Sequence, residues 1–509
     1  MLGLGTVDPV PDSGTIRVSM RLRPFLFFFA ILFCAASQAQ SLRVTEGVTD
    51  YQVFQRDFKN TRLDITVGGT VSAADGKEVE ERTSTANGVS EWSKVAAVQS
   101  GRWSGKVILG VGGPYRLEFR IAGETLGVVV EHVLVGDLWI LAGQSNMEGV
   151  GDMDDVQRPS PRVNMLDQTD QWRLAQEPLH RLVDAADRVH WQRNSKKQPE
   201  KLTGEALVNW MNARRKGAGL GLPFAVALSE ETAVPIGLIP CAHGGTSMDE
   251  WSPALRDKGG DSLYGAMYRR FQAAGGRVTG ILWYQGESDA NAKDAPQFRK
   301  KFEDFIAAVR RDFNDPDLPF YYVQIGRFVS KGPAEPWNLV QEEQRLAAIR
   351  VSNVHMVASV TSTLDDGIHV STADLKRLGN ELAELAHHRP IYSKVYPEER
   401  ALPQPAFIRR DGNLIRIGFS GGFGVLTSPG RISGFTIHDA TGAPVPLIYR
   451  AEIDPNERSV VRLYLDNSPA PGATIRYGYG RDPYCNLVDD RGFAVPVFGP
   501  IVLPQDAAK

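Results

Sequence analysis

Between residues 136 and 390 of the 509-residue chain, short apolar runs alternate with longer runs that have apolar residues at helical spacing. Strands that alternate with helices of this length predict a parallel sheet with helices on both faces, which is an α/β domain. The expected strands lie at 138–142, 234–239, 278–284, 319–325 and 354–360, and the expected helices at 262–274, 295–313, 337–350 and 373–388.

On both sides of this domain the apolar runs become short and alternating, and Gly, Pro, Asn and Asp separate them. Such a pattern is typical of sandwich-like modules made of short strands. We therefore expect one all-β module at 40–135 and a second at 391–509. The runs that carry this prediction lie at 63–67, 106–109 and 115–121 and at 414–419, 460–465 and 474–479.

A long, charged insertion interrupts the α/β domain near residues 152–221. Insertions of this length in a compact domain are usually functional or disordered. This one contains Trp172, Trp191 and Trp210, whose large side chains favour a folded flap near the site. Aromatic rings there would suit stacking against a sugar.

The composition is that of a globular protein, with 42% hydrophobic and 23% charged residues and a formal net charge of −3. A chain of 509 residues is too long for one core and should hold two or three domains. The sequence contains no block of like charges, so nucleic acid and anionic membrane surfaces are not expected partners.

The amino-terminal 39 residues have the pattern of a secretory signal peptide, and Met20 is then the expected true start. Basic residues at 21–23 precede an apolar run at 25–33, and small residues end the segment at Ala39. The apolar run is too short for a comfortable membrane span. These features predict export to the periplasm or the extracellular space, with no membrane span in the mature chain.

Three cysteines are present, and Cys34 would leave with the signal segment. So few cysteines in an exported protein indicate packed cores rather than a disulfide framework. We expect Cys241 and Cys485 to be buried thiols, with a bridge between them as the alternative.

Polar or glycine-rich residues follow four of the expected strands, at 143–149, 241–251, 283–289 and 365–369. The carboxyl ends of parallel strands meet at one edge of a sheet, where α/β proteins bind their ligands. We therefore expect these four segments to converge on a single site.

The residues in these segments suit acyl transfer by a serine nucleophile. The hydroxyl of Ser145 needs a base to take its proton, and His369 can act near neutral pH. Asp366 precedes His369 by three residues, a spacing that lets its carboxylate orient the ring. Donors for an oxyanion are available at the backbone N–H of Ser145, at Gly245 (with Gly244 as the alternative) and at the amide of Gln285.

Residues 143–147, 244–247, 285–287 and 366–369 (GQSNM, GGTS, QGE and DGIH) resemble the motifs of the SGNH/GDSL hydrolase superfamily. Within it they are most similar to the sialate O-acetylesterases and their acetylxylan-esterase relatives. Residues 51–55, 113–115 and 477–483 also look like that family, so that the resemblance extends into both flanking modules.

The resemblance implies an SGNH-type (flavodoxin-like) three-layer α/β/α domain and a secreted serine esterase that removes O-acetyl groups from a carbohydrate. It implies Ser145 as nucleophile, His369 as base, Asp366 as the residue that orients it, and Gly245 and Gln285 as oxyanion donors. The broader superfamily has an Asn where this chain has Gln285. A sialic acid is the expected substrate, without a cofactor.

Other polar residues have less specific signals. We interpret Glu287 as a hydrogen-bonding support of the site, with a direct catalytic role as the alternative. His243 could line the pocket or be structural, whereas His387 and His388 end a helix and are expected to be structural. Arg327 is a candidate partner for a sialate carboxylate. No grouping has the spacing of metal ligands, so no metal is predicted.

Three other functions remain open on the sequence alone. An acetylxylan or other polysaccharide acetylesterase would use the same residues. A lipase or thioesterase would need apolar walls, which the charged insertion does not offer. A non-catalytic glycan-binding protein is the third, and the joint presence of Ser145, Asp366 and His369 disfavours it.

Overall fold

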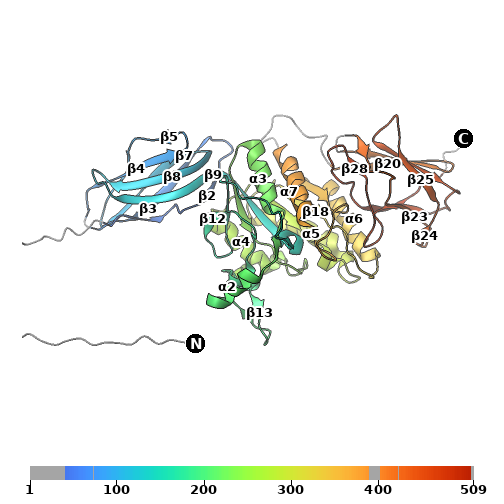
Figure 1. Ribbon diagram of the computed structural model, residues 1–509, viewed down its shortest axis with the longest axis horizontal. Helices are drawn as coiled ribbons and strands as arrows, with labels where there is room; N and C mark the ends of the chain where they lie inside the picture. The colour runs from blue at the N-terminus through green and yellow to red at the C-terminus, as the bar shows by residue number, and fades with distance from the viewer. Residues whose placement is uncertain (1–40, 73, 389–401, 422–423, 506–509) are drawn as a thin grey trace, which may run out of the picture. The chain divides into compact units, whose positions relative to one another are not determined.

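The computed structural model describes residues 41–72, 74–388, 402–421 and 424–505 (Figure 1). The predicted signal segment at 1–39 and the first residues of the predicted carboxyl-terminal module, 391–401, lie outside these ranges. Among the helices of the described part, none combines the length and the apolar character needed to cross a bilayer.

The amino-terminal strands form two sheets that enclose one apolar core. One sheet has the order β1-β3-β7, and in the other β4 pairs with β5, β6 and β8, and β8 with β9. Alternate side chains from both sheets meet in the core, as in a sandwich. The strands are β1 (Arg43–Glu46), β2 (Val53–Gln55), β3 (Arg62–Thr70), β4 (Glu78–Thr85), β5 (Gly88–Val89), β6 (Ser93–Ala97), β7 (Arg102–Gly110) and β8 (Gly112–Ile121).

A single long strand, β9 (Gly127–Gly143), connects this sandwich to the central sheet. Its first half pairs with β2 and β8, and its second half pairs with β16 and β17. The predicted boundary between residues 135 and 136 therefore falls inside a continuous strand. The buried Asp137, just past this boundary, forms an ion pair with Arg56 at 2.8 Å.

The central sheet has the strand order β12-β11-β16-β9-β17-β18-β19. All neighbours are parallel except β11 and β12. Every residue of β16, β17 and β18 is buried, as expected of strands covered on both faces. The strands are β11 (Val163–Leu166), β12 (Trp172–Leu174), β16 (Ile236–Pro240), β17 (Gly280–Tyr284), β18 (Phe320–Gln324) and β19 (Val354–Ala358).

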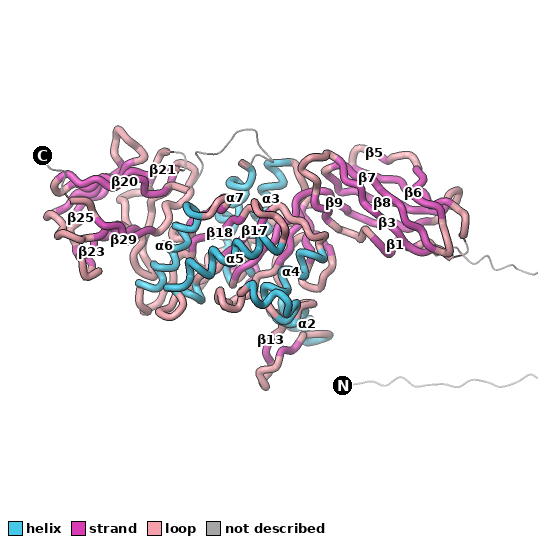
Figure 2. Tube along the Cα trace, turned by 180° about the vertical axis from the view of Figure 1, so that it is seen from behind, coloured by secondary structure: helices cyan, strands magenta, loops and turns pink. Residues whose placement is uncertain are grey.

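Helices cover both faces of this sheet, with α3 and α7 on one face and α4, α5 and α6 on the other (Figures 1 and 2). The predicted α/β domain and its strand and helix alternation are confirmed. The helices are α3 (Gly221–Thr232), α4 (Leu263–Ala273), α5 (Phe298–Asp312), α6 (Glu335–Arg350) and α7 (Thr372–His387), and 3-10 turns lie at Pro253–Asp261, Glu287–Asp289 and Ala295–Gln297.

The predicted insertion near 152–221 is folded, and part of it belongs to the sheet. β11 pairs in parallel with β16, which sequence periodicity had not indicated. The run that forms β11 is only four residues long, and tertiary pairing decided its conformation. The remaining elements are β10 (Gly151–Asp152), β13 (Gln192–Arg193), β14 (Pro199–Glu200), α2 (Gly204–Ala213), β15 (Lys216–Ala218) and 3-10 turns at Leu182–Asp184 and Arg188–His190.

The carboxyl-terminal strands form two four-stranded sheets, β20-β21-β26-β25 and β24-β23-β27-β29, around one core. This arrangement agrees with the predicted sandwich-like module. The strands are β20 (Gln404–Asp411), β21 (Leu414–Ser420), β22 (Leu426–Thr427), β23 (Phe435–His438), β24 (Pro444–Val445), β25 (Ile448–Ile453), β26 (Val460–Leu465), β27 (Thr474–Tyr477), β28 (Val488–Asp489) and β29 (Phe498–Val502).

Candidate active site

Ser145 lies at the carboxyl end of β9, where it begins the one-turn helix α1 (Ser145–Glu148). The strand ends at Gly143, whose φ of 132° is open to glycine and disfavoured for other residues. A side chain there would also collide with the backbone, because its Cβ would lie 2.2 Å from the carbonyl oxygen of Tyr284. The sharp turn after β9 thus depends on glycine, and it places Ser145, which is partly exposed, at the edge of the sheet.

Asp366 and His369 form a pair on the loop between β19 and α7. Nδ1 of His369 lies 2.7 Å from Oδ2 of Asp366, and the backbone N–H of His369 donates to Oδ1 at 2.9 Å. Lys216 donates to the same carboxylate at 3.0 Å. Burial opposes ionisation of Asp366, but these hydrogen bonds outweigh it and hold the pKa of Asp366 well below its usual value. The carboxylate is therefore ionised at neutral pH and orients the ring.

Asn146 connects the serine turn to the histidine loop. Its Oδ1 accepts a hydrogen bond from the backbone N–H of Val370 at 3.0 Å, and its Nδ2 donates to Oε1 of Glu287 at 2.8 Å. Because Asn146 follows Ser145 and Val370 follows His369, the first bond sets the two loops side by side. The structure thus brings together three of the four predicted segments around one buried amide.

Glu287 accepts the hydrogen bond from the side-chain amide of Asn146, which agrees with the supporting role predicted for it. Burial raises the pKa of Glu287, while the hydrogen bond from Asn146 and the nearby charge of His369 oppose that rise. The carboxyl group of Glu287 therefore fixes the side chain of Asn146, which is the residue next to the candidate nucleophile Ser145.

A second, partly buried carboxyl group, Glu148, holds the glycine turn at 243–246. The backbone N–H of Gly244 donates to Oε2 of Glu148 at 2.7 Å. A methyl group at Gly244 would lie only 3.5 Å from Cβ of Ser145, so the turn passes close beside the serine. Burial raises the pKa of Glu148, against opposing effects of Gly244, Arg214 and His369. Sequence reasoning missed Glu148, although it lies within the GQSNMEG stretch.

The two glycines of this turn differ in their availability as oxyanion donors. Gly244 already donates its N–H to Glu148, whereas Gly245 is exposed and has a φ of 71°. A Cβ built on Gly245 would meet nothing within 4 Å. The geometry therefore favours Gly245 over Gly244 as the residue that faces a substrate.

Gln285, the third predicted oxyanion donor, lies in the interior. Its side chain is wholly buried, and its Nε2 donates to the backbone oxygen of Thr246 at 3.1 Å and to Asp289. Oδ2 of Asp289 also accepts from the backbone N–H of Met248 at 2.9 Å. In this geometry both N–H groups of the amide are engaged in holding the segment after Gly245.

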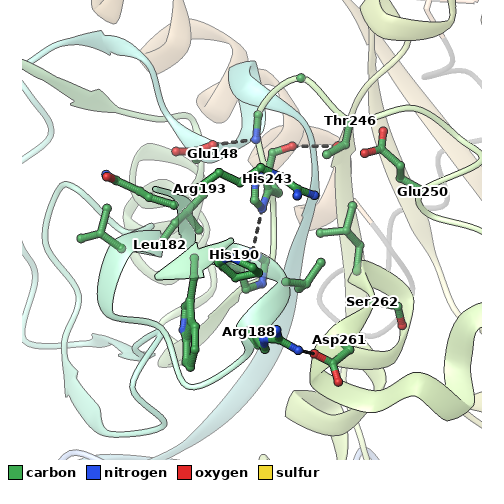
Figure 3. A pocket seen from close by; sticks show the side chains of 18 of the residues that line it. Glu148, Leu182, Arg188, His190, Arg193, His243, Thr246, Glu250, Asp261 and Ser262 are labelled. Carbon is green, nitrogen blue, oxygen red and sulfur yellow. Dashed lines mark hydrogen bonds and ion pairs between the residues drawn. The ribbon is translucent and has the colours of Figure 1, made fainter. Parts of the chain in front are cut away.

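A cavity of about 840 Å³ opens beside this turn, and residues of the insertion form its far wall (Figure 3). Glu148, Gly244 and Gly245 line its inner side. Trp191 and Trp210 line it from the insertion, which agrees with the predicted flap. Both basic and acidic side chains line it, namely Arg188, Arg193, Arg214, Lys258, Glu148, Glu250 and Asp261.

Two stacked histidines lie in the same cavity. The rings of His190 and His243 are 5.3 Å apart, and their Nδ1 atoms are 3.1 Å apart. Burial lowers the pKa of both rings, so both are neutral at neutral pH. Of the two interpretations of His243, the structure supports the one that places it in the pocket. His190 could not be found from the sequence, because no local pattern marks its partner.

Arg327, His387 and His388 do not line the cavity. Arg327 forms an ion pair with Asp482 of the carboxyl-terminal module at 3.0 Å, so it is engaged away from the cavity. His387 and His388 end α7 and lie 3.9 Å from Glu231 and Glu384, respectively.

Cys241 and Cys485 are free, buried thiols, and the alternative of a bridge between them is wrong. Burial raises their pKa to about 11 and about 12, respectively, so neither is a reactive thiolate near neutral pH. Within the described ranges, no group of three or more His, Cys, Asp or Glu side chains is arranged to hold a metal ion.

Comparison with known proteins shows similarity to carbohydrate esterases. Residues 135–388 match a family model described as a carbohydrate esterase, sialic acid-specific acetylesterase. A protein of Arabidopsis thaliana described as a probable carbohydrate esterase is 30% identical over 288 residues, which cover 52% of this chain and 94% of that protein. The crystal structure of a carbohydrate acetylesterase from Xanthomonas citri has the same fold, with a TM-score of 0.60 and 24% identity over 90% of this chain and 99% of that one.

Proposed function

The chain belongs to the carbohydrate esterase family described as sialic acid-specific acetylesterases, and we propose that it hydrolyses O-acetyl esters of a sugar through a serine nucleophile. The observation that carries this proposal is the Asp366–His369 pair on the loop that Asn146 binds next to Ser145. The strand order β16-β9-β17-β18-β19 supports an SGNH-type, flavodoxin-like catalytic domain, because these strands follow the order 2-1-3-4-5 along the chain when β11 is left aside.

The mechanism follows the logic of a catalytic triad. Oγ of Ser145 attacks the acetyl carbonyl carbon while its proton passes to Nε2 of His369. The tetrahedral intermediate then expels the sugar oxygen, which takes the proton from His369. A water molecule, deprotonated by His369, attacks the acetyl-enzyme, and acetate leaves as Ser145 regains its proton. Asp366 stabilises the imidazolium in both steps.

Backbone donors stabilise the oxyanion in this proposal. The N–H of Ser145 and the N–H of Gly245 lie on two neighbouring turns, because a Cβ on Gly244 would lie 3.5 Å from Cβ of Ser145. Glu148 and Gln285 act indirectly, by holding the glycine turn. Glu148 accepts a hydrogen bond from the N–H of Gly244, and Gln285 donates one to the backbone oxygen of Thr246.

The cavity supports a sialic acid as the acetylated sugar. Trp191 can cover an apolar sugar face, and the cations Arg193 and Lys258 can bind the sugar carboxylate. The alternative is an acetylated neutral polysaccharide such as xylan, which the mixture of basic and acidic side chains in the cavity also permits.

The experiment that tests the function measures acetate release from O-acetylated sialic acid and from acetylated xylan, with the wild type and with Ser145→Ala. We expect release from the sialic acid by the wild type alone. Release from xylan alone would assign the polysaccharide alternative. Failure to release acetate from any glycan or aryl acetate would instead indicate a non-catalytic glycan-binding protein.

We also propose that the protein is exported. The basic lead, the apolar run and the small residues before Gln40 support this. Amino-terminal sequencing of the protein from its native host should begin near Gln40, and a retained Met20 would exclude the proposal.

A further inference from the structure

The cavity of about 840 Å³ is called the catalytic cavity because Glu148, Gly244 and Gly245, which lie beside Ser145, line it. A second cavity, of about 410 Å³, shares two lining residues with it. The shared residues are Trp210 and Arg214, and the guanidinium of Arg214 lies 4.9 Å from the centre of the Trp210 ring. This volume lies within the range of small-molecule sites.

An unsatisfied amide lies in the wall of this second cavity. Gln168 is 2% exposed, and its Nε2 donates to the backbone oxygen of Pro240 at 3.1 Å. Its Oε1 is buried and, among the described residues, has no hydrogen-bond partner. A buried acceptor without a donor destabilises the protein, so a ligand that donates a hydrogen bond would be favoured there. A purely apolar ligand would leave that acceptor unpaired.

The charged groups of the cavity already have partners. Arg173 binds Asp167 at 2.6 Å, and Arg181 binds Asp184 at 2.7 Å. Arg214 lies near Glu177, and its guanidinium donates to the backbone oxygen of His180 at 3.1 Å. The paired charges indicate a neutral ligand with hydroxyl groups.

The apolar part of the wall suits the same kind of ligand. Tyr51 and Trp210 supply aromatic surface, and Met165 and Leu174 supply aliphatic surface. Sugars have apolar C–H faces and hydroxyl edges, so one neutral sugar residue would match both the apolar wall and the unpaired oxygen of Gln168.

We propose that this cavity is a second carbohydrate subsite, which binds a neutral sugar residue of the glycan whose acetylated residue occupies the catalytic cavity. The proposal rests on the proposed function and adds to it that the substrate is an oligosaccharide. The shared wall of Trp210 and Arg214 places the subsite next to the catalytic cavity.

The test uses two variants of the second cavity with matched controls. Leu174→Trp fills the cavity, and Leu126→Trp makes the same change at a side chain that is 84% exposed in the amino-terminal module. Gln168→Leu removes the acceptor, and Gln171→Leu is its exposed control. The Michaelis constant is measured for O-acetylated free sialic acid, O-acetylated sialyl-lactose, acetylated xylo-oligosaccharides and an aryl acetate. Binding of lactose and xylobiose is measured by calorimetry.

We expect both cavity variants to raise KM for the oligosaccharides by about tenfold and to weaken disaccharide binding, with hydrolysis of the aryl acetate unchanged. The controls should behave as the wild type. Unchanged KM and unchanged disaccharide binding in folded Leu174→Trp would overturn the subsite. If Leu174→Trp fails to fold, the KM values and the disaccharide binding of Gln168→Leu test the subsite instead. Failure of the proposed function is distinct, because the wild type would then lack esterase activity while calorimetry still reports on the cavity.

Discussion

The two sides of the candidate active site differ in how they hold their carboxyl groups. On the serine side, Glu148 and Glu287 are enclosed, and burial raises the pKa of both. On the histidine side, Asp366 is 38% exposed in its side chain, and hydrogen bonds hold its pKa well below the usual value. The same functional group is thus disfavoured as an anion on one side and favoured on the other.

This difference matches the tasks of the two sides. The serine side needs fixed turns, and a carboxyl oxygen can accept a backbone N–H whether or not the group is ionised. The histidine side needs a negative charge that stabilises an imidazolium, which requires an ionised Asp366. The predictions below test this division, from the largest expected effect to the smallest.

The largest effect should come from the proposed nucleophile and base. Ser145→Ala, His369→Ala and the double variant should each lower kcat on an aryl acetate by about 10⁴-fold to 10⁶-fold, to a similar residual rate, because the two residues act as a unit. Steady-state kinetics measures this. Near wild-type turnover of Ser145→Ala would remove Ser145 from the mechanism.

The charge of Asp366 is tested by Asp366→Asn, which keeps the shape of the side chain. We expect kcat to fall by up to ~10⁴-fold with the fold intact, because the neutral amide cannot stabilise the imidazolium. Circular dichroism serves as the control for folding. A fall of only a few-fold would mean that His369 takes its charge support from Glu287 instead.

Glu148 is expected to act through shape rather than charge. Glu148→Ala frees the N–H of Gly244 and should lower kcat by about 10–100-fold with little change in KM. Glu148→Gln keeps an acceptor oxygen and should restore most of the activity. Asp261→Ala, at the rim of the same cavity, is the control and should have little effect. Equal losses in both Glu148 variants would show that the charge is needed on the serine side as well.

The variant Gln285→Ala distinguishes two roles of this residue, support of the glycine turn and direct stabilisation of the oxyanion. Gln285→Ala leaves the oxygen of Thr246 and the carboxyl of Asp289 without their donor, at about 1–3 kcal/mol. The melting temperature should fall while kcat stays within a few-fold of wild type. A fall in kcat of about 10²-fold with an unchanged melting temperature would restore Gln285 as an oxyanion donor.

The smallest effect is a pH dependence of opposite sign on the two sides. The pKa of Asp366 is lower in the folded state, so its ionised form adds stability above the unfolded pKa, near 3.9, and this contribution is lost as the pH falls. The pKa of Glu148 is raised, so its contribution is present below about 4.3 and is lost as the pH rises. The melting temperature of Asp366→Asn should therefore fall further below that of wild type as the pH rises toward about 3.9, and that of Glu148→Gln should rise relative to wild type as the pH increases above about 4.3. Parallel trends in the two variants would contradict the comparison.

Local sequence patterns determined much of this protein. The apolar periods at 278–284 and 337–350 specify a strand and a helix because the repeat of each is set within a few residues. The turn after β9 could be predicted from the small residues at 143–146, because Gly143 must adopt a positive φ. The three-residue spacing of Asp366 and His369 was sufficient to pair them, since both lie on one short loop.

Only the tertiary structure decided the contacts between distant segments. The choice between Gly244 and Gly245 depends on Glu148, which lies 96 residues away in the chain from Gly244. His190 meets His243 across 53 residues, and Gln285 faces Thr246 across 39. No local period encodes such pairs, because the partners are set by how the insertion and the strand ends pack against each other. The second cavity arises in the same way, from side chains of several elements whose spacing in the sequence carries no common signal.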